Sequence, residues 1–159
     1  MKYLVREIEP RDDLAVESVI RSCLIEFGAD HEGTAWADPD LCRFSSVYAK
    51  HGYKYWVAED QEGRIVGGAG IGLLHGIDGY CELMKMYCLP EARGTGIADE
   101  LMTMALDFAA EHYSYCYLET LGNMTRAHRF YEKYGFYRVD KPLVITDHYA
   151  CEIKYLKKL

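Results

Sequence analysis

The run Arg93-Gly94-Thr95-Gly96-Ile97-Ala98 has the residue types and spacing of a site for an anion. It follows an apolar stretch that ends at Pro90, and it opens directly into a segment with helical spacing of apolar residues. Glycine lets the backbone approach an anion closely, and the first N–H groups of a helix have no internal partner. Such N–H groups, together with the helix dipole, bind phosphate oxygens. We therefore expect a phosphate-binding turn here that needs neither a metal nor a lysine.

Two familiar phosphate motifs do not match this run. No Gly-Lys-Ser/Thr follows the glycines, as a P-loop requires, and the spacing is not G-x-G-x-x-G. On spacing alone, the run is equally compatible with a strand-to-helix corner that binds no ligand.

Glu82 stands out because it lies in the otherwise apolar stretch 80–89. A carboxylate is costly to bury unless it is used or paired. Two interpretations remain open: a general base, or a residue that faces outward or pairs with Lys85. Glu119, which follows the next apolar stretch, is a second candidate base, with a cap or an ion pair as its alternative. His75 could act through water, although a histidine in a turn is more often simply exposed.

These candidates need elements that position them, and the sequence predicts the order β-α-α-β-β-β-α-β-α-β-β. The predicted strands are 2–8, 53–59, 64–74, 80–89, 113–118, 136–139 and 148–155. The predicted helices are 13–28, about 39–51, the segment after the glycine run, and 127–134. Strands 53–89, joined by tight turns, are expected to be antiparallel neighbours. This pattern predicts one mixed α/β domain over residues 1–159.

Composition favours a globular protein without nucleic-acid partners. Half of the 159 residues are hydrophobic, 27% are charged, and the formal net charge is -7. Phosphate backbones require clustered Lys and Arg, whereas an acidic surface is compatible with an amine substrate. None of the six cysteines forms a C-x-x-C pair, so we expect no metal site and a reducing compartment. The N-terminus does not resemble a signal peptide and no window is apolar enough to span a membrane, which predicts a cytoplasmic protein.

Two motifs resemble those of the GNAT acetyltransferase superfamily. The first is Pro90-x-x-Arg93-Gly94-x-Gly96-Ile97-Ala98, which is similar to the R/Q-x-x-G-x-G/A signature of that family. The second is Ala127-x-x-Phe130-Tyr131-x-Lys133-x-Gly135-Phe136. The predicted element order also fits the GNAT fold, a mostly antiparallel seven-stranded mixed sheet flanked by four helices. The resemblance covers essentially the whole chain.

The resemblance implies acetyl-CoA as cosubstrate and assigns residues to it. The backbone of the glycine signature would bind the pyrophosphate of CoA. The strand before it would splay at a bulge and pair with pantetheine, and one of its N–H groups would polarise the thioester carbonyl. Asn123 lies one residue before the position where the family often carries an asparagine that contacts CoA, and it could instead cap the next helix. The cofactor-binding residues implied are Met86, Tyr87, Cys88, Arg93, Gly94, Thr95, Gly96, Ile97, Ala98, Asp99 and Asn123.

The resemblance also implies catalytic roles. Tyr131 matches the tyrosine that protonates the departing CoA thiolate in many members, although it could be an aromatic core residue. Glu82 lies where the histone-acetylating branch carries its base, and Glu119 matches the base of the branch that acetylates protein N-termini. Cys88 could accept the acetyl group covalently, but no activating histidine lies at a recognisable spacing.

The function predicted is acetyl transfer to a primary amine of a small molecule or peptide, by direct attack in a ternary complex. The alternatives are a non-catalytic acyl-CoA-binding module and a nucleotide-binding domain of another kind. We expect the acceptor pocket to involve loop 28–39, the second helix and turn 75–79. Residues expected there are Trp36, Tyr48, Tyr53 and Tyr80, with Asp30, Glu32, Asp38 and Asp40 as attractors of a cation. The last strand could pair between subunits in a homodimer.

Overall fold

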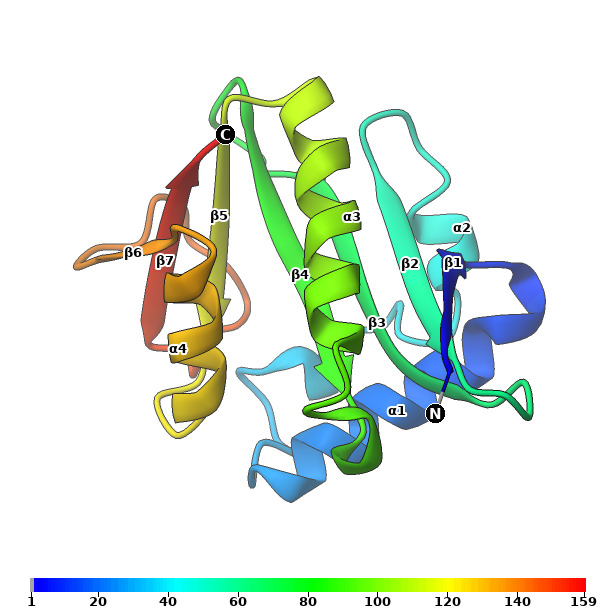
Figure 1. The fold of residues 1–159 in the computed structure, drawn as a ribbon. Coiled ribbons are helices and arrows are strands. Elements are labelled where there is room, and N and C mark those ends of the chain that lie inside the picture. Colours follow the sequence, from blue (N-terminus) through cyan, green and yellow to red (C-terminus); the bar gives the residue numbers. More distant parts are fainter. Residues whose placement is uncertain (1) are drawn as a thin grey trace.

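The apolar patterns of the sequence fold into one seven-stranded sheet with helices on both faces (Figure 1). The computed structural model describes residues 2–159. The strands are β1 (Leu4–Glu7), β2 (Lys54–Glu59), β3 (Ile65–Leu73), β4 (Tyr80–Cys88), β5 (Tyr115–Thr120), β6 (Tyr137–Val139) and β7 (Ile153–Lys158). The helices are α1 (Asp13–Glu26), α2 (Phe44–Val47), α3 (Ile97–His112) and α4 (Thr125–Lys133). The predicted order of strands and helices, and the α/β fold class, are confirmed.

The sheet has the strand order β1-β2-β3-β4-β5-β7-β6. Every neighbouring pair is antiparallel except β4 and β5, which are parallel. The prediction that β2, β3 and β4 are antiparallel neighbours is therefore confirmed. Strands β4 and β5 pair only from Tyr80 to Glu82 on β4, opposite Tyr115 to Tyr117 on β5. Beyond Glu82 the two strands diverge, and the edge of β4 that faces β5 has no strand partner.

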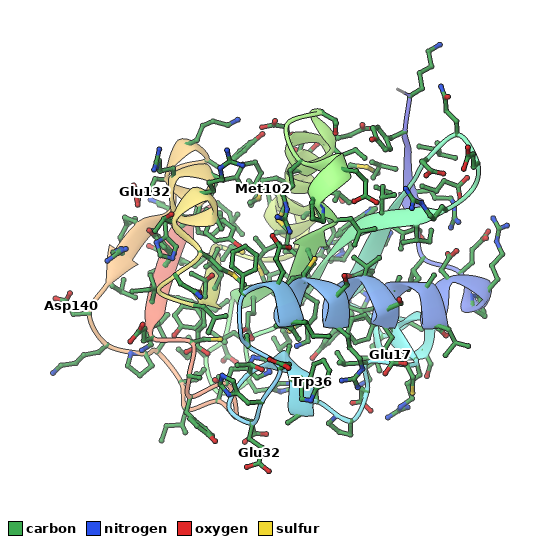
Figure 2. All side chains as sticks on the ribbon, turned by 90° about the horizontal axis from the view of Figure 1, so that it is seen from below. Glu17, Glu32, Trp36, Met102, Glu132 and Asp140 are labelled. Atoms are coloured by element: carbon green, nitrogen blue, oxygen red, sulfur yellow. The ribbon has the colours of Figure 1, made fainter. Side chains whose placement is uncertain are left out.

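Two apolar layers hold the helices against the sheet. Figure 2 shows α1 on one side of the sheet, with α3 and α4 on the other. Under α1 and α2 lies a cluster that includes Val16, Ile20, Leu24, Phe44 and Tyr55. On the other face the cluster includes Ile97, Leu101, Met102, Ala105 and Tyr131. The apolar stripe read from the sequence of α3 is thus the buried face of that helix.

Glycines in the centre of β3 make room for two tyrosine rings. A Cβ at Gly68 would lie 2.7 Å from the ring of Tyr55, and one at Gly70 would lie 2.6 Å from Tyr55 and 2.7 Å from Tyr48. Real Cβ atoms do not come so close to other atoms, so a larger residue would push these rings out of place. The glycines therefore let the ring of Tyr55, on β2, lie over β3. Its hydroxyl donates to the carbonyl oxygen of Lys85, on β4, at 2.8 Å.

The second helix is shorter than predicted. The sequence indicates a helix over about 39–51, but α2 is a single turn, Phe44–Val47. Phe44 and Tyr48 supply the helical spacing, whereas Arg43 turns back to Asp40 in an ion pair of 2.6 Å.

The last strand also starts later than predicted. Residues 148–152 belong to the loop before β7, which begins at Ile153. That loop is held across the molecule by Ala150, whose N–H donates to the carbonyl oxygen of Gly33 at 2.9 Å. Strand β7 lies between β5 and β6, and β6 pairs with residues 154–156 of it.

Three findings concern the chemistry available to the described residues. All six cysteines are free thiols. Within residues 2–159 no group of three or more His, Cys, Asp or Glu side chains is arranged to hold a metal ion. In the same part of the chain, no helix has the length and apolar character needed to cross a membrane.

Candidate active site

The glycine turn before α3 presents a row of backbone N–H groups without partners. Gly94 and Gly96 have φ of +75° and +90°, and no atom lies within 4 Å of a Cβ built at either position. Arg93 N donates to Pro90 O and Glu100 N to Gly96 O, but in the described chain the amides of residues 94–99 donate to no protein acceptor. They lie at the positive end of the sixteen-residue helix α3. The turn can therefore bind phosphate oxygens, as its sequence indicates.

Arg93 and Asp99, both predicted to contact the cofactor, are engaged within the protein. The guanidinium of Arg93 donates to both carboxylate oxygens of Glu26 at 2.7 Å, and its Nε donates to Cys88 O at 3.0 Å. The side chain of Asp99 accepts from Lys133 at 2.6 Å and from Tyr134. These contacts tie the turn to α1 and α4. Asp99 can still offer its backbone N–H, whereas both the amide and the side chain of Arg93 are already used.

Strand β4 carries a bulge at Lys85, the only non-glycine residue among those described with a left-handed backbone (φ +53°). The register with β3 shifts here, since Gly70 pairs with Met84 but Gly68 pairs with Tyr87. The bulge changes which side chains share a face. Met84 and Tyr87 both pack toward the α1 layer, while Met86 and Cys88 pack toward the α3 layer. The predicted bulge is thus present, and the strand alternation of β4 reverses across it.

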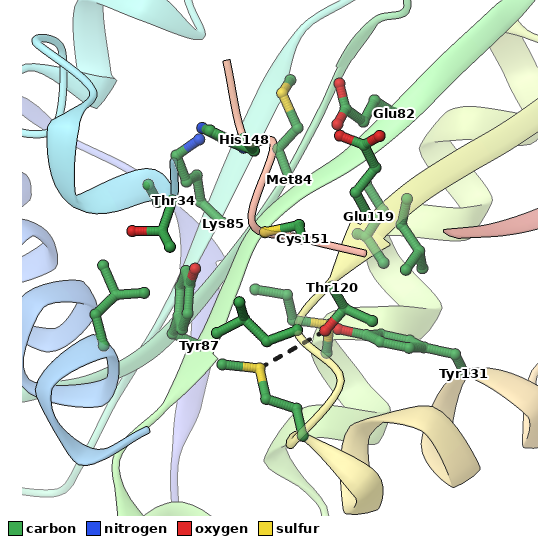
Figure 3. A pocket seen from close by; sticks show the side chains of 17 residues that line it. Thr34, Glu82, Met84, Lys85, Tyr87, Glu119, Thr120, Tyr131, His148 and Cys151 are labelled. Atoms are coloured by element: carbon green, nitrogen blue, oxygen red, sulfur yellow. Dashed lines mark hydrogen bonds between the residues drawn. The ribbon is translucent and has the colours of Figure 1, made fainter. Parts of the chain in front are cut away.

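A small pocket of about 60 Å³ lies where β4 and β5 diverge, between α4, loop 28–43 and loop 140–152 (Figure 3). Five of the residues singled out in the sequence line it: Glu82, Met86, Tyr87, Glu119 and Tyr131. Cys88, Asn123 and His75 are not among the residues that line it. Asn123 Nδ2 donates to Phe27 O at 2.9 Å, and His75 Nε2 lies 3.2 Å from the hydroxyl of Tyr53. The pocket therefore brings together the two predicted catalytic residues.

Glu82 is the pocket carboxylate without a protein partner. Its side chain accepts no hydrogen bond and forms no ion pair with the residues described, and it faces the pocket. Burial raises the pKa of Glu82 to about 7, with the charge of Glu119 adding to the effect and that of Lys85 opposing it. The salt bridge to Lys85 weighed from the sequence is not formed, because Lys85 pairs with Asp38 at 2.7 Å. A carboxylate with this pKa can take a proton near neutral pH.

Glu119 lies in the same pocket but is already bonded. One of its oxygens accepts from the hydroxyl of Tyr117 at 2.9 Å, and the other accepts from Thr146 at 2.7 Å. Both donors hold the carboxylate in place and compete with a substrate for its lone pairs. Of the two candidate bases, Glu82 is the one whose oxygens are available.

Tyr131 is 8% exposed and lines the pocket, and its hydroxyl makes no hydrogen bond to the described protein. Its ring packs against Phe136 and Tyr155 at 6.1 Å and 5.9 Å between centroids. Burial raises the pKa of Tyr131, so the phenol stays protonated at neutral pH and can donate. Tyr131 is therefore both a core aromatic residue and a hydroxyl donor toward the pocket, and the two interpretations from sequence do not exclude each other.

The thiol of Cys88 is unsuited to covalent catalysis. Burial raises the pKa of Cys88 to about 12, which leaves almost none of it as the reactive thiolate at neutral pH.

Lys85 and His148 line the pocket although neither was assigned to it from the sequence, and both contact Asp38, which was expected near the acceptor as an attractor of a cation. Asp38 contacts both side chains: Lys85 Nζ lies 2.7 Å and His148 Nε2 lies 2.9 Å from its Oδ2. Although burial opposes the shift, the hydrogen bond from His148 and the charge of Lys85 lower the pKa of Asp38. Sequence reasoning missed this cluster because its members come from three distant segments. The remaining signal, an isolated lysine in an apolar strand, was interpreted only as a partner for Glu82.

The aromatic residues expected to line the pocket lie elsewhere. Trp36, Tyr48, Tyr53 and Tyr80 are absent from its walls. Tyr48 is buried among aromatic rings below β3, and Tyr80 stacks on Tyr115 at 4.8 Å. Loop 28–39 contributes Thr34 and Ala35 instead, and Asp38 binds Lys85 and His148 of the protein itself.

Comparison with known proteins places this geometry among acetyltransferases. Residues 51–138 match the acetyltransferase (GNAT) domain. The chain is 40% identical over 159 residues to the uncharacterized N-acetyltransferase YjgM of Escherichia coli K12, covering 98% of this chain and 95% of that protein. It is 34% identical over 113 residues to human N-acetylaspartate synthetase, which covers 70% of this chain but only 35% of that protein.

Solved structures share the whole fold. A GNAT-family acetyltransferase from Staphylococcus aureus Mu50 superimposes with a TM-score of 0.86 at 22% identity, covering 99% of both chains. The PaiA N-acetyltransferase of Thermoplasma acidophilum, solved in complex with coenzyme A, gives a TM-score of 0.71 at 17% identity and covers 100% of both chains.

Proposed function

This chain belongs to the GNAT family of acetyltransferases, and we propose that it transfers the acetyl group of acetyl-CoA to a primary amine by direct attack, with both substrates bound together. The family resemblance inferred from the motifs at residues 90–98 and 127–136 is confirmed, since both motifs fall within the matched segment 51–138. The observation that carries the proposed reaction is Glu82, a carboxylate with a pKa of about 7 and no protein partner, facing the same pocket as Tyr131.

The chain has backbone groups that suit acetyl-CoA, the cosubstrate that supplies the acetyl thioester. The unpartnered amides of residues 94–99 suit its pyrophosphate. The unpaired edge of β4 after Glu82 offers backbone donors and acceptors of the kind that pair with the amides of pantetheine. Met86, Tyr87 and Cys88 belong to this edge. Asn123, whose Nδ2 donates to Phe27 O, completes the proposed set.

Glu82 would take the proton that an ammonium must lose before it can attack. A base is most effective when its pKa lies near the working pH, and burial has moved Glu82 into that range. Holding the amine and the thioester in one pocket makes the attack effectively intramolecular. No covalent enzyme intermediate is needed, in keeping with the protonated thiol of Cys88.

Tyr131 would donate a proton or a hydrogen bond to the departing thiolate. Its hydroxyl has no competing acceptor among the described residues, and its raised pKa keeps the proton available. The rings of Phe136 and Tyr155 fix its direction.

The alternative is a module that binds acyl-CoA without turnover. The name of the human relative, N-acetylaspartate synthetase, supports turnover and an acetylated nitrogen as the product. The test is CoA release from acetyl-CoA in the presence of a panel of primary amines, with calorimetry for CoA binding and mass spectrometry of the products. We expect amine-dependent release and an N-acetylated product. Tight CoA binding without release for any amine would support the binding module, and absence of CoA binding would contradict both.

A further inference from the structure

We propose that the acceptor is a small amine that also carries a carboxylate, that is, an amino acid, and that Lys85 and His148 bind this carboxylate while the amine faces Glu82. The inference rests on the proposed function, because it names the substrate class of that same pocket. It is carried by the placement of Lys85 and His148 in the same pocket as Glu82 and Glu119.

Two pairs of polar side chains line the pocket, Lys85 with His148 and Glu82 with Glu119. Lys85 and His148 are joined through Asp38. Glu82 and Glu119 lie close enough for the charge of Glu119 to raise the pKa of Glu82 (Figure 3). A zwitterion fits this arrangement, with its ammonium toward Glu82 and Glu119 and its carboxylate toward Lys85 and His148.

Lys85 reaches the pocket only because of the bulge. In a regular strand, residues three apart point to opposite faces, so Glu82 and Lys85 could not line one pocket. The left-handed backbone at Lys85 (φ +53°) places both side chains there. Such a conformation is strained for a residue with a Cβ, and strain of this kind concentrates at ligand sites. The hydrogen bond from Tyr55 to the Lys85 carbonyl holds it in place.

Lys85 retains donors for a ligand, and one ring nitrogen of His148 has no partner among the described residues. A lysine ammonium has three donors, and in the described chain Asp38 is the only acceptor near Nζ of Lys85. His148 uses Nε2 toward Asp38, and its Nδ1 has no protein partner among those residues. The side chains of Lys85 and His148 are 9% and 22% exposed, so a carboxylate bound there would be well shielded from water. Charge-assisted hydrogen bonds are strong in such surroundings.

The same cluster disfavours acceptors without a carboxylate. A diamine would bring a second ammonium against Lys85, where like charges repel. A large acceptor would meet loop 28–43 and loop 140–152, which are joined over the pocket by the Ala150–Gly33 hydrogen bond of 2.9 Å. A free amino acid carries both groups that these side chains can bind.

The first experiment uses matched acceptors with the whole protein. CoA release is measured for the common amino acids, and the best one is compared with its decarboxylated amine, its primary amide and putrescine. We expect kcat/KM for the amino acid to exceed that for the decarboxylated amine by about 100-fold, as for loss of one partner of a buried charge pair. Equal or faster turnover of the amine, the amide or putrescine would overturn the inference.

The second experiment tests whether Lys85→Met weakens the preference for the amino acid over its decarboxylated amine. The ratio of kcat/KM for the amino acid to that for its decarboxylated amine should fall at least about tenfold, by loss of a charged hydrogen bond. Lys141→Met, at an exposed lysine on loop 140–152, is the matched control and should keep the wild-type ratio. If Lys85→Met does not fold, His148→Gln tests the same carboxylate site. A fall in kcat/KM by the same factor for both substrates would contradict carboxylate binding by Lys85.

The outcomes separate the two proposals. Acetylation of simple amines as fast as amino acids would remove the amino-acid inference and leave the transferase proposal standing. CoA binding with no acetylation of any amine would remove both.

Discussion

The glycine turn before α3 and the charged pocket beside β4 are built in opposite ways. The turn is contiguous, residues 94–99, and it presents backbone N–H groups. The pocket draws side chains from loop 28–43, β4, β5, α4 and loop 140–152. Backbone groups are the same whatever the side chain, so a local turn can serve every member of a family. Side chains from distant segments are free to change, and under the proposed function they would set which acceptor is acetylated.

The difference predicts that changes in the pocket alter the chemical step, whereas changes in the turn alter cofactor affinity. Glu82→Gln should have the largest effect, a loss of about 10²–10³-fold in kcat with CoA affinity retained, because a general base contributes that much. The wild-type rate should rise with pH through about 7 as Glu82 loses its proton, and the variant should lack this limb. Steady-state kinetics from pH 5.5 to 9 and calorimetry with CoA check these expectations. A loss in kcat of less than about 10²-fold would contradict the role of Glu82 as general base.

Glu119→Gln is the matched control for Glu82→Gln, since it removes the neighbouring pocket carboxylate. Its hydrogen bonds to Tyr117 and Thr146 indicate a positioning role, so we expect a loss of less than about tenfold. A larger loss for Glu119→Gln than for Glu82→Gln would assign the base to Glu119 instead.

Glu82→Gln should also stabilise the protein at high pH. The folded state holds the Glu82 proton to about pH 7, whereas the ordinary pKa is 4.5, so wild-type stability falls as pH rises between these values. Above pH 7 the full cost is present, at most about 3 kcal/mol, and glutamine avoids it. Thermal unfolding at pH 5 and pH 8 should show a gain that is larger at pH 8. A loss of stability at pH 8 would mean that the carboxylate is paired after all.

Tyr131→Phe should lower kcat by about ten- to a hundredfold and leave CoA affinity near its wild-type value. The change removes only the hydroxyl, and the aromatic packing with Phe136 and Tyr155 is kept. Tyr137→Phe, at the exposed strand β6, is the control and should have the wild-type rate. Unchanged turnover in Tyr131→Phe would show that water or another donor protonates the thiolate.

Gly96→Val should act on the glycine turn. Valine is disfavoured at φ +90° by about 1–2 kcal/mol, so the turn must relax or be strained to bind phosphate. We expect the Kd for CoA to rise about 5- to 30-fold, with kcat at saturation much less affected. Gly76→Val is the matched control, because Gly76 has φ +95° and the same open surroundings but lies in a different turn. Equal Kd values for the two variants would contradict phosphate binding at residues 94–99.

This contrast also explains what could be read from the sequence. The turn was predictable because glycine spacing, the proline before it and the apolar stripe of α3 are all local signals. Glu82 was found because a lone carboxylate in an apolar strand is conspicuous. The Lys85–Asp38–His148 cluster was not found from the sequence, since it depends on a bulge that reverses the strand alternation and on a loop that was predicted as strand. Trp36, Tyr48, Tyr53 and Tyr80 do not line this pocket. For Tyr48 the reason is related, because its ring packs over Gly70 of β3 with that of Tyr55.

Tyr55→Phe should have the smallest effect, and it tests whether the bulge links the glycine turn to the charged pocket. Tyr55 touches neither directly, but its hydroxyl holds the Lys85 carbonyl at 2.8 Å. Loss of one buried hydrogen bond should lower stability by about 1–2 kcal/mol. If the Tyr55 hydroxyl holds the bulge in place, its loss should also raise KM for the acceptor severalfold, because Lys85 and the adjacent edge of β4 lose their fixed direction. We expect kcat to change little. Tyr48→Phe, in the same aromatic cluster but without a hydrogen bond to β4, is the control. A change in stability alone, with the acceptor KM of wild type, would leave Tyr55 a core residue and show that the β3 glycines serve packing only.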